Sequence, residues 1–499
     1  MIRQRFYFAL FIVAGLFWSA PTALAQPEPT RLDLNVQEID KALENEWFGL
    51  YMEGKKIGYL NSTRAKVTEN GKTVYRETTL MNMKLLSAFQ KSELKVEQTM
   101  DFDNAAPFRL LRGSFVHSDG KISQRITLTA KGKGYEVVIT LGGNEQKKDI
   151  GDLDYTLADS MGSELWVQRK PKKGEKITTR DLDMDELKIH LVTTTLLESK
   201  ESLVNGVKVL FHEVSSLNHS KSITSESRYD EKGRLISGTV AGLMEMRRET
   251  EQQAKDTQFS SDLFLLGMAK INKEIGLDKE RGAKTLTGLI LEIESKDNPQ
   301  LPDGPRQTLV AKGDGVYQLR IGKQHGKIVK ATDKEIKEGL EETIAYPISD
   351  AKVKELAKKA VGNAKTDEEK AKNICKFVKD FIEPTLAATV PKMHDLMERK
   401  EGDCKSYALL FTCLCRANGL SSREVSGFVY MGDDIKAFGG HAWNEVLLDG
   451  YWVPVDASLN QVDADPTHIC LGTDKESANN LLKTFGKLNF KLIEVQTNN

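Results

Sequence analysis

One cysteine in the C-terminal part of the chain stands where its thiol could act as a nucleophile. Cys404 follows Gly402-Asp403 and opens a run of helical, mostly apolar residues that ends at Asn418-Gly419. This pattern predicts that Cys404 lies in the first turn of a helix, where unpaired backbone N–H groups and the positive end of the helix dipole favour a thiolate. Because the thiolate is the reactive form of cysteine, Cys404 is a candidate for covalent catalysis.

A histidine and an aspartate downstream are predicted to share one face of a hairpin. Asp449-Gly450 separates two apolar runs, and Asp-Gly between apolar strands is a strong signal for a two-residue hairpin loop. With that loop, Asp456 becomes the diagonal neighbour of His441. Diagonal partners have Cβ atoms about 7–8 Å apart, a gap that an imidazole and a carboxylate close with a hydrogen bond. A bulge at Pro454 would shift this register.

Together the three residues supply the roles that thiol chemistry on an amide requires. Cys404 would attack the carbonyl carbon, His441 would take up and return the proton, and Asp456 would orient the imidazole and stabilise its cation. A thioester intermediate follows, with the backbone N–H of Cys404 as the natural oxyanion donor. The alternatives are an inert core thiol for Cys404 and a strand-ending residue for Asp456.

The other polar and aromatic residues near these positions have ordinary structural explanations. Cys375, Cys413 and Cys415 are expected to be buried, inert thiols. Trp443 and Trp452 are expected to be packing residues, although Trp443 shares the face of His441. His468, an isolated histidine near these motifs, is expected to be structural and receives no role. Asp463 and Asp465 lack the spacing of a calcium-binding loop, so neither a metal nor a cofactor is predicted.

Three short segments resemble the motifs of the transglutaminase-like, papain-related superfamily. They are Gly402-Asp403-Cys404, Gly440 to Glu445 and Trp452 to Asp456, and the similarity extends over roughly residues 345–475. The resemblance implies a papain-like α+β fold with Cys404, His441 and Asp456 at the catalytic positions. It also implies chemistry on glutamine, peptide or isopeptide amides, in a superfamily that includes hydrolases and inactive members.

The elements that must position these residues change character along the chain. From about Trp47 to Arg248 apolar residues alternate with polar ones, which predicts a large, curved antiparallel sheet with one face solvated or lining a groove. After Pro347 the period becomes helical: Ser349 is predicted to cap a helix that stops at Gly362. The capping-box pair Thr366 and Glu369 predicts the next helix.

This organisation predicts an α+β protein with a large antiparallel β-sheet domain followed by a papain-like domain. A chain of 499 residues exceeds the size of a single hydrophobic core. We expect a signal peptide over 1–25, an N-terminal antiparallel β domain over 26–250, a strand-rich bridging module over 262–335 and a transglutaminase-like catalytic domain over 336–499. The polar stretch 250–261 is predicted to be a linker.

The N-terminus has the pattern of a secretory signal. Arg3 and Arg5 precede the apolar stretch Phe6 to Phe17, and Ala23-Leu24-Ala25 is a small-residue cleavage site. We therefore expect an exported protein, periplasmic or extracellular, without a membrane span once residues 1–25 are removed. The formal net charge of −1 argues against a nucleic-acid partner.

Two functions from different classes fit these features. The first is an exported cysteine peptidase, amidase, deamidase or protein-glutamine transamidase. Its substrate would be an amide in a peptide or protein, for example in the cell envelope. Hydrolysis is preferred, because crosslinking requires a cleft dry enough to exclude water. The second is a non-catalytic binding or scaffold protein of the cell envelope with a vestigial transglutaminase-like module.

Overall fold

A computed structural model describes residues 27–498 of the chain, with gaps. The gaps are residues 53, 88–89, 119–122, 142–143, 205–206, 222, 241, 258–266, 278–285, 296–298, 300, 305, 323–328, 344, 386–391, 474–483 and 485–486. The predicted signal peptide lies outside the described residues. The chain divides into two compact units, and the division falls between residues 262 and 263.

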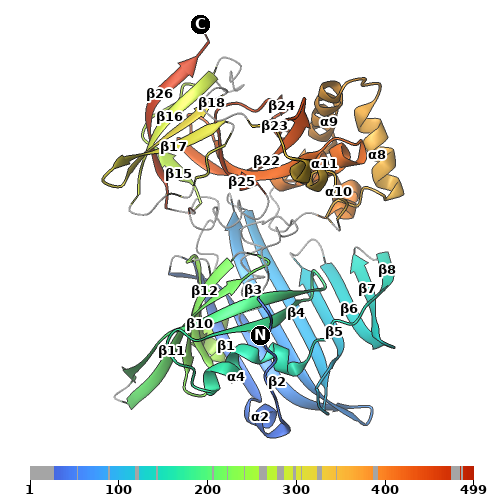
Figure 1. The fold of residues 1–499 in the computed structure, drawn as a ribbon, viewed down its shortest axis with the longest axis vertical. Helices are drawn as coiled ribbons and strands as arrows, with labels where there is room; N and C mark the ends of the chain where they lie inside the picture. Colours follow the sequence, from blue (N-terminus) through green and yellow to red (C-terminus); the bar gives the residue numbers. More distant parts are fainter. Residues whose placement is uncertain are drawn as a thin grey trace. The chain divides into compact units, whose positions relative to one another are not determined.

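The first unit is built around one antiparallel sheet in which most neighbours in space are also neighbours in sequence (Figure 1). Strands β1 to β8 follow one another across one half and β9 to β14 across the other, and β1 pairs with β14 where the halves meet. The described strands are β1 (Glu44–Met52), β2 (Lys55–Glu69), β3 (Lys72–Ser87), β4 (Gln90–Asp103), β5 (Leu110–Ser118), β6 (Ser123–Lys131), β7 (Gly134–Leu141), β8 (Asn144–Ile150), β9 (Lys176–Asp183), β10 (Lys188–Val204), β11 (Val207–Asn218), β12 (Ile223–Asp230), β13 (Leu235–Val240) and β14 (Met244–Glu249).

The period-two pattern of the sequence produces this sheet. Along β12, for example, buried and exposed side chains alternate from Ile223 onward, as expected when one face of a sheet covers a core. A hairpin turns after Lys131, where β6 and β7 pair with Lys131 opposite Gly134. The large antiparallel sheet expected for this part of the chain is therefore present.

Short helices accompany the sheet: α2 (Val36–Lys41), α3 (Leu157–Ser160), α4 (Gly162–Gln168) and α5 (Glu251–Lys255). Helix α5 corrects the expectation of a linker after Thr250. Thr250 caps this helix in a capping box with Gln253, and Ala254 is fully buried. The helix packs against β1 and β2, and the Lys255 ammonium lies 4.6 Å from the centre of the Trp47 ring. A cap and one buried alanine are enough to order this polar segment.

The second unit contains a mixed sheet with the order β17-β18-β16-β26-β15-β22-β21-β25, and β23 pairs with β22 and with β24. Its strands are β15 (Ala269–Ile271), β16 (Leu286–Glu294), β17 (Gln307–Gly313), β18 (Val316–Gly322), β21 (Ser422–Tyr430), β22 (Ala437–Leu448), β23 (Tyr451–Asp456), β24 (Gln461–Val462), β25 (His468–Thr473) and β26 (Asn489–Thr497), beside the short pair β19 (Glu383–Pro384) and β20 (Glu401–Gly402). Strands from the expected bridging module thus share one sheet with the strand that carries His441.

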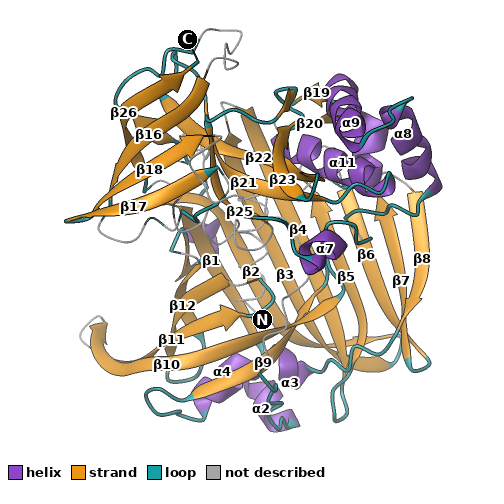
Figure 2. Cartoon of the chain, turned by 45° about the horizontal axis from the view of Figure 1, so that its top comes forward, coloured by secondary structure: helices purple, strands orange, loops and turns teal. Residues whose placement is uncertain are grey.

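Helices gather beside β22 and β23 in this unit (Figure 2). They are α7 (Asp333–Glu338), α8 (Ala351–Val361), α9 (Asp367–Phe381), α10 (Met393–Arg399) and α11 (Cys404–Ala417). The core between them includes Ile374 from α9, Leu410 from α11 and Val446 from β22, all fully buried. The predicted α+β class, with a large antiparallel sheet ahead of a domain that combines helices and strands, is confirmed. Among the described residues, no helix has the length and apolar character needed to span a bilayer.

The start of α8 differs from the prediction by one residue. Asp350, not Ser349, caps the helix by accepting hydrogen bonds from the backbone N–H groups of Lys352 and Val353. The Ser349 hydroxyl instead donates to Glu342 Oε1 at 2.5 Å. Two adjacent cap-forming residues compete here, and the carboxylate, which the helix dipole favours, takes the position.

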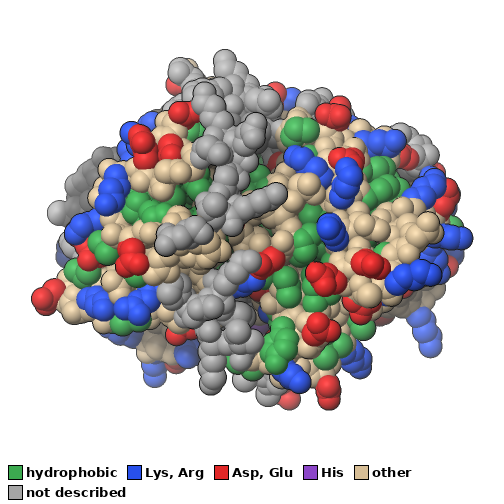
Figure 3. All heavy atoms as spheres, turned by 90° about the horizontal axis from the view of Figure 1, so that it is seen from above, with side chains coloured by type: hydrophobic (Ala, Val, Ile, Leu, Met, Phe, Trp, Pro, Cys, Tyr) green, Lys and Arg blue, Asp and Glu red, His purple; other side chains and the backbone are tan. Residues whose placement is uncertain are grey.

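The surface carries charges of both signs. On the face shown in Figure 3, Lys and Arg side chains lie interspersed with Asp and Glu side chains, in keeping with the formal net charge of −1. Charges mixed in this way screen one another and produce little field at a distance.

Candidate active site

Cys404 is the first residue of helix α11, as predicted. Asp403 forms the N-cap, and its side chain accepts a hydrogen bond of 3.1 Å from the backbone N–H of Lys405. Gly402 lies so close to Ser406 that a Cβ atom at residue 402 would stand 2.2 Å from the serine Cβ. The glycine thus lets the chain turn tightly into the helix, and the Cys404 thiol is placed at its N-terminus, where a negative charge is favoured.

The hairpin that carries His441 and Asp456 has the predicted register. Leu448 pairs with Tyr451, and the ladder continues without a shift past Pro454 to the pair Asn444–Val455. Asp449 and Gly450 both have positive φ values, 51° and 84°, as a type I′ turn requires. No bulge at Pro454 shifts this ladder, and Asp456 lies where it can reach His441.

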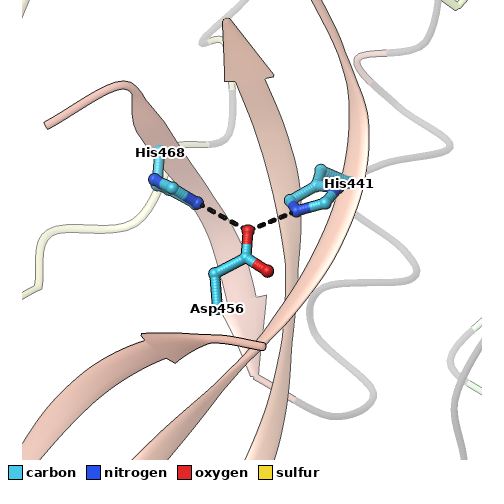
Figure 4. Close-up of side chains that lie close together, drawn as sticks. All are labelled: His441, Asp456 and His468. Carbon is cyan, nitrogen blue, oxygen red and sulfur yellow. Dashed lines mark hydrogen bonds and ion pairs between the residues drawn. The ribbon is translucent and has the colours of Figure 1, made fainter. Parts of the chain in front are cut away.

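The carboxylate of Asp456 and the imidazole of His441 form a buried hydrogen bond. His441 Nε2 lies 2.7 Å from Asp456 Oδ2 (Figure 4), and the side chains are 10% and 1% exposed. Because Asp456 engages Nε2, the other ring nitrogen, Nδ1, is left for the thiol of Cys404. The structure thus brings the three predicted residues together; their catalytic roles stay a prediction.

The electrostatics of this cluster favour a charged histidine. Burial by itself lowers the pKa of His441, but the nearby Asp456 carboxylate and the interaction with Cys404 outweigh it and raise the pKa to about 10. Burial raises the pKa of Asp456, and the two histidines beside it hold that pKa well below its usual range. An anionic Asp456 next to a cationic His441 is the arrangement that stabilises an imidazolium–thiolate pair.

Asp456 is held independently of His441. Its second oxygen, Oδ1, accepts hydrogen bonds from the backbone N–H of Ser458 at 2.8 Å, from the Ser458 hydroxyl at 2.7 Å and from the backbone N–H of Leu459 at 3.2 Å. The turn after β23 therefore fixes the carboxylate plane, and Oδ2 is left to face the imidazole. A rigid orienting carboxylate keeps the imidazole in one tautomer and one direction.

A buried amide ties the helix of Cys404 to the strand of His441. Asn444 is fully buried, and its side-chain NH2 donates to the Ala408 carbonyl oxygen at 2.9 Å and to Thr412 Oγ1 at 2.8 Å. Asn444 lies three residues after His441 on β22, while Ala408 lies one turn after Cys404 on α11. These hydrogen bonds fix the register between the two elements and so set the distance from thiol to imidazole.

A second histidine, to which the sequence assigned no role, contacts the same carboxylate. His468 Nε2 lies 3.1 Å from Asp456 Oδ2, and its side chain is 4% exposed (Figure 4). His468 starts β25, which reaches β22 only through β21. No local pattern connects His468 to the motifs of Cys404, His441 and Asp456, so sequence reasoning had no signal for this contact.

The indole of Trp443 packs against both histidines. The Trp443 ring stacks on His441, with centroids 6.1 Å apart and an interplanar angle of 19°, and meets His468 edge-on at 5.2 Å. Gly427, on the strand between β22 and β25, leaves room for this indole. The contact confirms that Trp443 shares the face of His441.

We expect Gly427→Ala to destabilise the protein by about 1–3 kcal/mol, the usual cost of overpacking. An added Cβ would stand 2.0 Å from the Ile469 carbonyl oxygen and 2.6 Å from the Trp443 ring, so the strand or the indole would have to shift. Urea unfolding measures the effect. Gly440→Ala is the matched control, since a Cβ at residue 440, also in the sheet, meets no atom within 4 Å. Equal stability of the two variants would contradict the steric argument.

Two groups of described residues present possible metal ligands within 4.8 Å of one another: His441, Asp456 and His468, and Asp183, Glu186 and His190. In the first group both histidines direct Nε2 at one carboxylate oxygen, as in a hydrogen-bonded cluster. In the second, Lys221 already supplies a cation, with Nζ 2.6 Å from Asp183 and 3.2 Å from Glu186. Ion pairing accounts for both groups, and neither is assigned to a metal.

Comparison with known sequences agrees with this geometry. Residues 354–457 match the sequence model of the transglutaminase-like superfamily, a stretch that begins in α8 and contains Cys404, His441 and Asp456. The fold and the match together define a transglutaminase-like domain within this chain. The matched stretch ends before His468.

Individual relatives share only part of the chain. Kyphoscoliosis peptidase from Homo sapiens is 31% identical over 115 residues, which cover 21% of this chain and 17% of that protein. The chain thus matches less than a fifth of this curated relative. Among solved structures, a candidate cysteine protease from Cytophaga hutchinsonii aligns with 43% of this chain and 84% of its own, at 14% identity and a TM-score of 0.28. A β-barrel-like protein from Brucella abortus aligns with 41% of this chain and 94% of its own, at 10% identity and a TM-score of 0.30.

Proposed function

We propose that this protein is an exported cysteine enzyme that transfers the acyl group of an amide to Cys404 and then to a second nucleophile. One observation carries the proposal. A cysteine at a helix N-terminus interacts with a buried histidine whose far nitrogen is held, 2.7 Å away, by an ionised aspartate. This arrangement supports roles for Cys404 as nucleophile, His441 as base and Asp456 as orienting group in thiol catalysis.

In the first half of the reaction the Cys404 thiolate attacks the amide carbonyl carbon. A tetrahedral oxyanion forms beside the start of α11, where the backbone N–H of Cys404 is available to stabilise it. The His441 imidazolium then gives its proton to the departing nitrogen, the C–N bond breaks, and ammonia or an amine leaves. The acyl group remains on sulfur as a thioester, and Asp456 holds the now neutral His441 in place.

In the second half a new nucleophile opens the thioester. His441 removes a proton from water or from an amine, the new C–O or C–N bond forms, and the C–S bond breaks to regenerate the thiolate. Water yields a carboxylic acid, as in peptide hydrolysis or deamidation, whereas a lysine amine yields a crosslink. Hydrolysis is the proposed outcome, because excluding water needs a closed, dry cleft.

The proposed substrate is an amide of a peptide or protein outside the cytoplasm, with the cell envelope as one source. Support comes from the signal-peptide pattern over residues 1–25 and from the mixed surface charge, which offers no broad basic face to a polyanion in the view of Figure 3.

The decisive experiment incubates the mature protein with glutamine-containing peptides and a primary amine and measures product masses. Replacement of ammonia by water means deamidation, incorporation of the amine means transamidation, and two shorter peptides mean peptidase activity. Products that also form with the Cys404→Ala variant would contradict a thioester mechanism. No product from any peptide, together with a Cys404 no more reactive toward iodoacetamide than a free thiol, would favour the scaffold function.

A further inference from the structure

The hydrogen bonds of His468 define its protonation state. Nε2 lies 3.1 Å from Asp456 Oδ2, and Nδ1 lies 3.0 Å from the backbone carbonyl oxygen of Asp465. A carbonyl oxygen only accepts hydrogen bonds, so Nδ1 must carry a proton. The state of Nε2 then depends on whether Asp456 accepts or donates.

Asp456 can only accept at this position. Its Oδ1 takes hydrogen bonds from two backbone N–H groups and one hydroxyl, and its Oδ2 faces the Nε2 atoms of both His441 and His468. A proton on the carboxyl would displace one of these donors, and the two histidines hold the pKa of Asp456 well below its usual range. Nε2 of His468 is therefore a donor as well. An imidazole that donates from both nitrogens is a cation.

We propose that His468 is a positioning residue of the active site, a buried imidazolium that shares the carboxylate of Asp456 with His441. This inference rests on the proposed function and deepens it. The site contains four side chains instead of three, and the fourth lies on β25, outside the stretch that matches the superfamily model. His468 acts on the chemistry only through Asp456 and His441.

The charges around His468 support this assignment. Burial lowers the pKa of His468, and the hydrogen bonds to Asp456 and Asp465 outweigh it and raise the pKa above its ordinary value. Among the described residues, the titratable groups that face the ring are Asp456 from β23, Asp465 from the segment before β25 and His441 from β22. Cys404 interacts with His441, and His468 acts on Cys404 only through Asp456 and His441.

A fixed positive charge on His468 should shift the titration of His441 in a predictable direction. The centroids of the His441 and His468 rings are 5.9 Å apart, so the His468 charge opposes protonation of His441. It therefore lowers the pH at which His441 loses its proton. With an effective dielectric constant of about 20 to 40, Coulomb's law at this separation gives a shift of about 1–2 pH units.

The first test measures the charge of His468 directly and needs no substrate. In the Cys404→Ala variant at pH 7, nitrogen NMR of the imidazole side chains should show both His468 nitrogens protonated, with or without EDTA. His212 is the internal control: burial lowers its pKa, so it should be neutral in the same spectrum. A neutral His468, or a His468 signal that changes when EDTA is added, would overturn the proposal.

The second test measures the effect of that charge on Cys404. The rate of iodoacetamide alkylation, localised to Cys404 by mass spectrometry, is followed against pH for wild type and for His468→Gln, in which a neutral amide replaces the ring. The part of the profile that reports loss of the His441 proton should move to higher pH by about 1–2 units, as estimated above. His219→Gln, in the other unit, makes the same substitution away from the site and should leave the profile unchanged.

The outcomes separate this inference from the proposed function. A His468→Gln profile that falls at every pH without a shift in the pH at which His441 loses its proton would show a purely structural contact and overturn the proposal. If His468→Gln does not fold, Asp465→Asn replaces it: removal of one anion beside His468 should make the ring titrate at lower pH in the NMR experiment, and an unchanged titration would contradict the model of a shared charge. Failure to turn over any amide would refute the enzyme function while leaving both readouts intact.

Discussion

Replacing Cys404 with alanine should reduce turnover of an amide substrate by about 10⁴- to 10⁶-fold, the range seen when a nucleophile of a catalytic triad is removed. The variant retains the helix start and the His441–Asp456 hydrogen bond, and it lacks the sulfur on which the acyl group must rest. Substrate binding should survive, so the loss should appear in kcat and not in KM.

The matched control is Cys413→Ala, which removes a thiol from the same helix. Cys413 is fully buried, and burial raises the pKa of its thiol to about 12, so it cannot supply a thiolate near neutral pH. This variant should keep its activity within a few-fold of wild type. Comparable losses in both variants would show that the defect lies in the packing of α11 and not in chemistry at Cys404.

Replacing Asp456 with asparagine should lower kcat by about 10⁴-fold, as for other triads whose carboxylate becomes an amide. The carboxylate accepts hydrogen bonds at both oxygens, from the following turn at Oδ1 and from the two histidines at Oδ2, whereas an amide has one accepting oxygen and must turn its NH2 toward one of these sets of donors. With the NH2 toward the histidines, His441 loses the tautomer that directs Nδ1 at the thiol. The same change leaves a buried imidazolium without its counter-ion. We therefore also expect a loss of stability of about 3–5 kcal/mol at neutral pH, the usual cost of breaking a buried ion pair by removing one partner.

The pH dependence of that stability loss has a definite sign. The pKa of Asp456 is lower in the folded than in the unfolded protein, so its ionisation stabilises the fold above the unfolded value of about 3.9 and ceases to do so as the pH falls through the folded value. Urea unfolding of wild type and Asp456→Asn should thus differ fully at pH 6–7 and converge in acid. Asp380→Asn, at an exposed pair with Lys376, is the control and should change stability by less than about 1 kcal/mol. A pH-independent difference would exclude the ionised carboxylate as its cause.

The sequence predicted the structure correctly where the residues that determine the local geometry lie in one short segment. Asp449-Gly450 sets the hairpin loop, the loop sets the register, and the register places Asp456 against His441. The capping box of Thr366 and Glu369 likewise starts α9 at Asp367, as predicted. In each case the determining atoms lie within a few residues of one another, so a local pattern is sufficient.

Local sequence patterns could not predict contacts between segments that lie far apart in the sequence. His468 reaches Asp456 because β25 pairs with β21, a pairing that no turn signal in the sequence specifies. Asn444 sits in a strand pattern as an ordinary polar residue, and only the packing of α11 on β22 shows that its amide joins the two elements. Helix α5 was missed because its five residues contain one apolar anchor, Ala254, whose burial depends on the sheet beneath it.

The shared sheet of the second unit limits how the transglutaminase-like region can be excised. A fragment of residues 336–499 would lose β15, which lies between β22 and β26, and β16, which lies beside β26. The backbone groups at one end of β22 and along both sides of β26 would then face water as open edges, which invite strands from other molecules. A shorter fragment of residues 354–457 would lack β25 and leave Asp456 with one histidine. A fragment chosen from the family match alone would thus lack His468 and strands of the sheet that supports the candidate site.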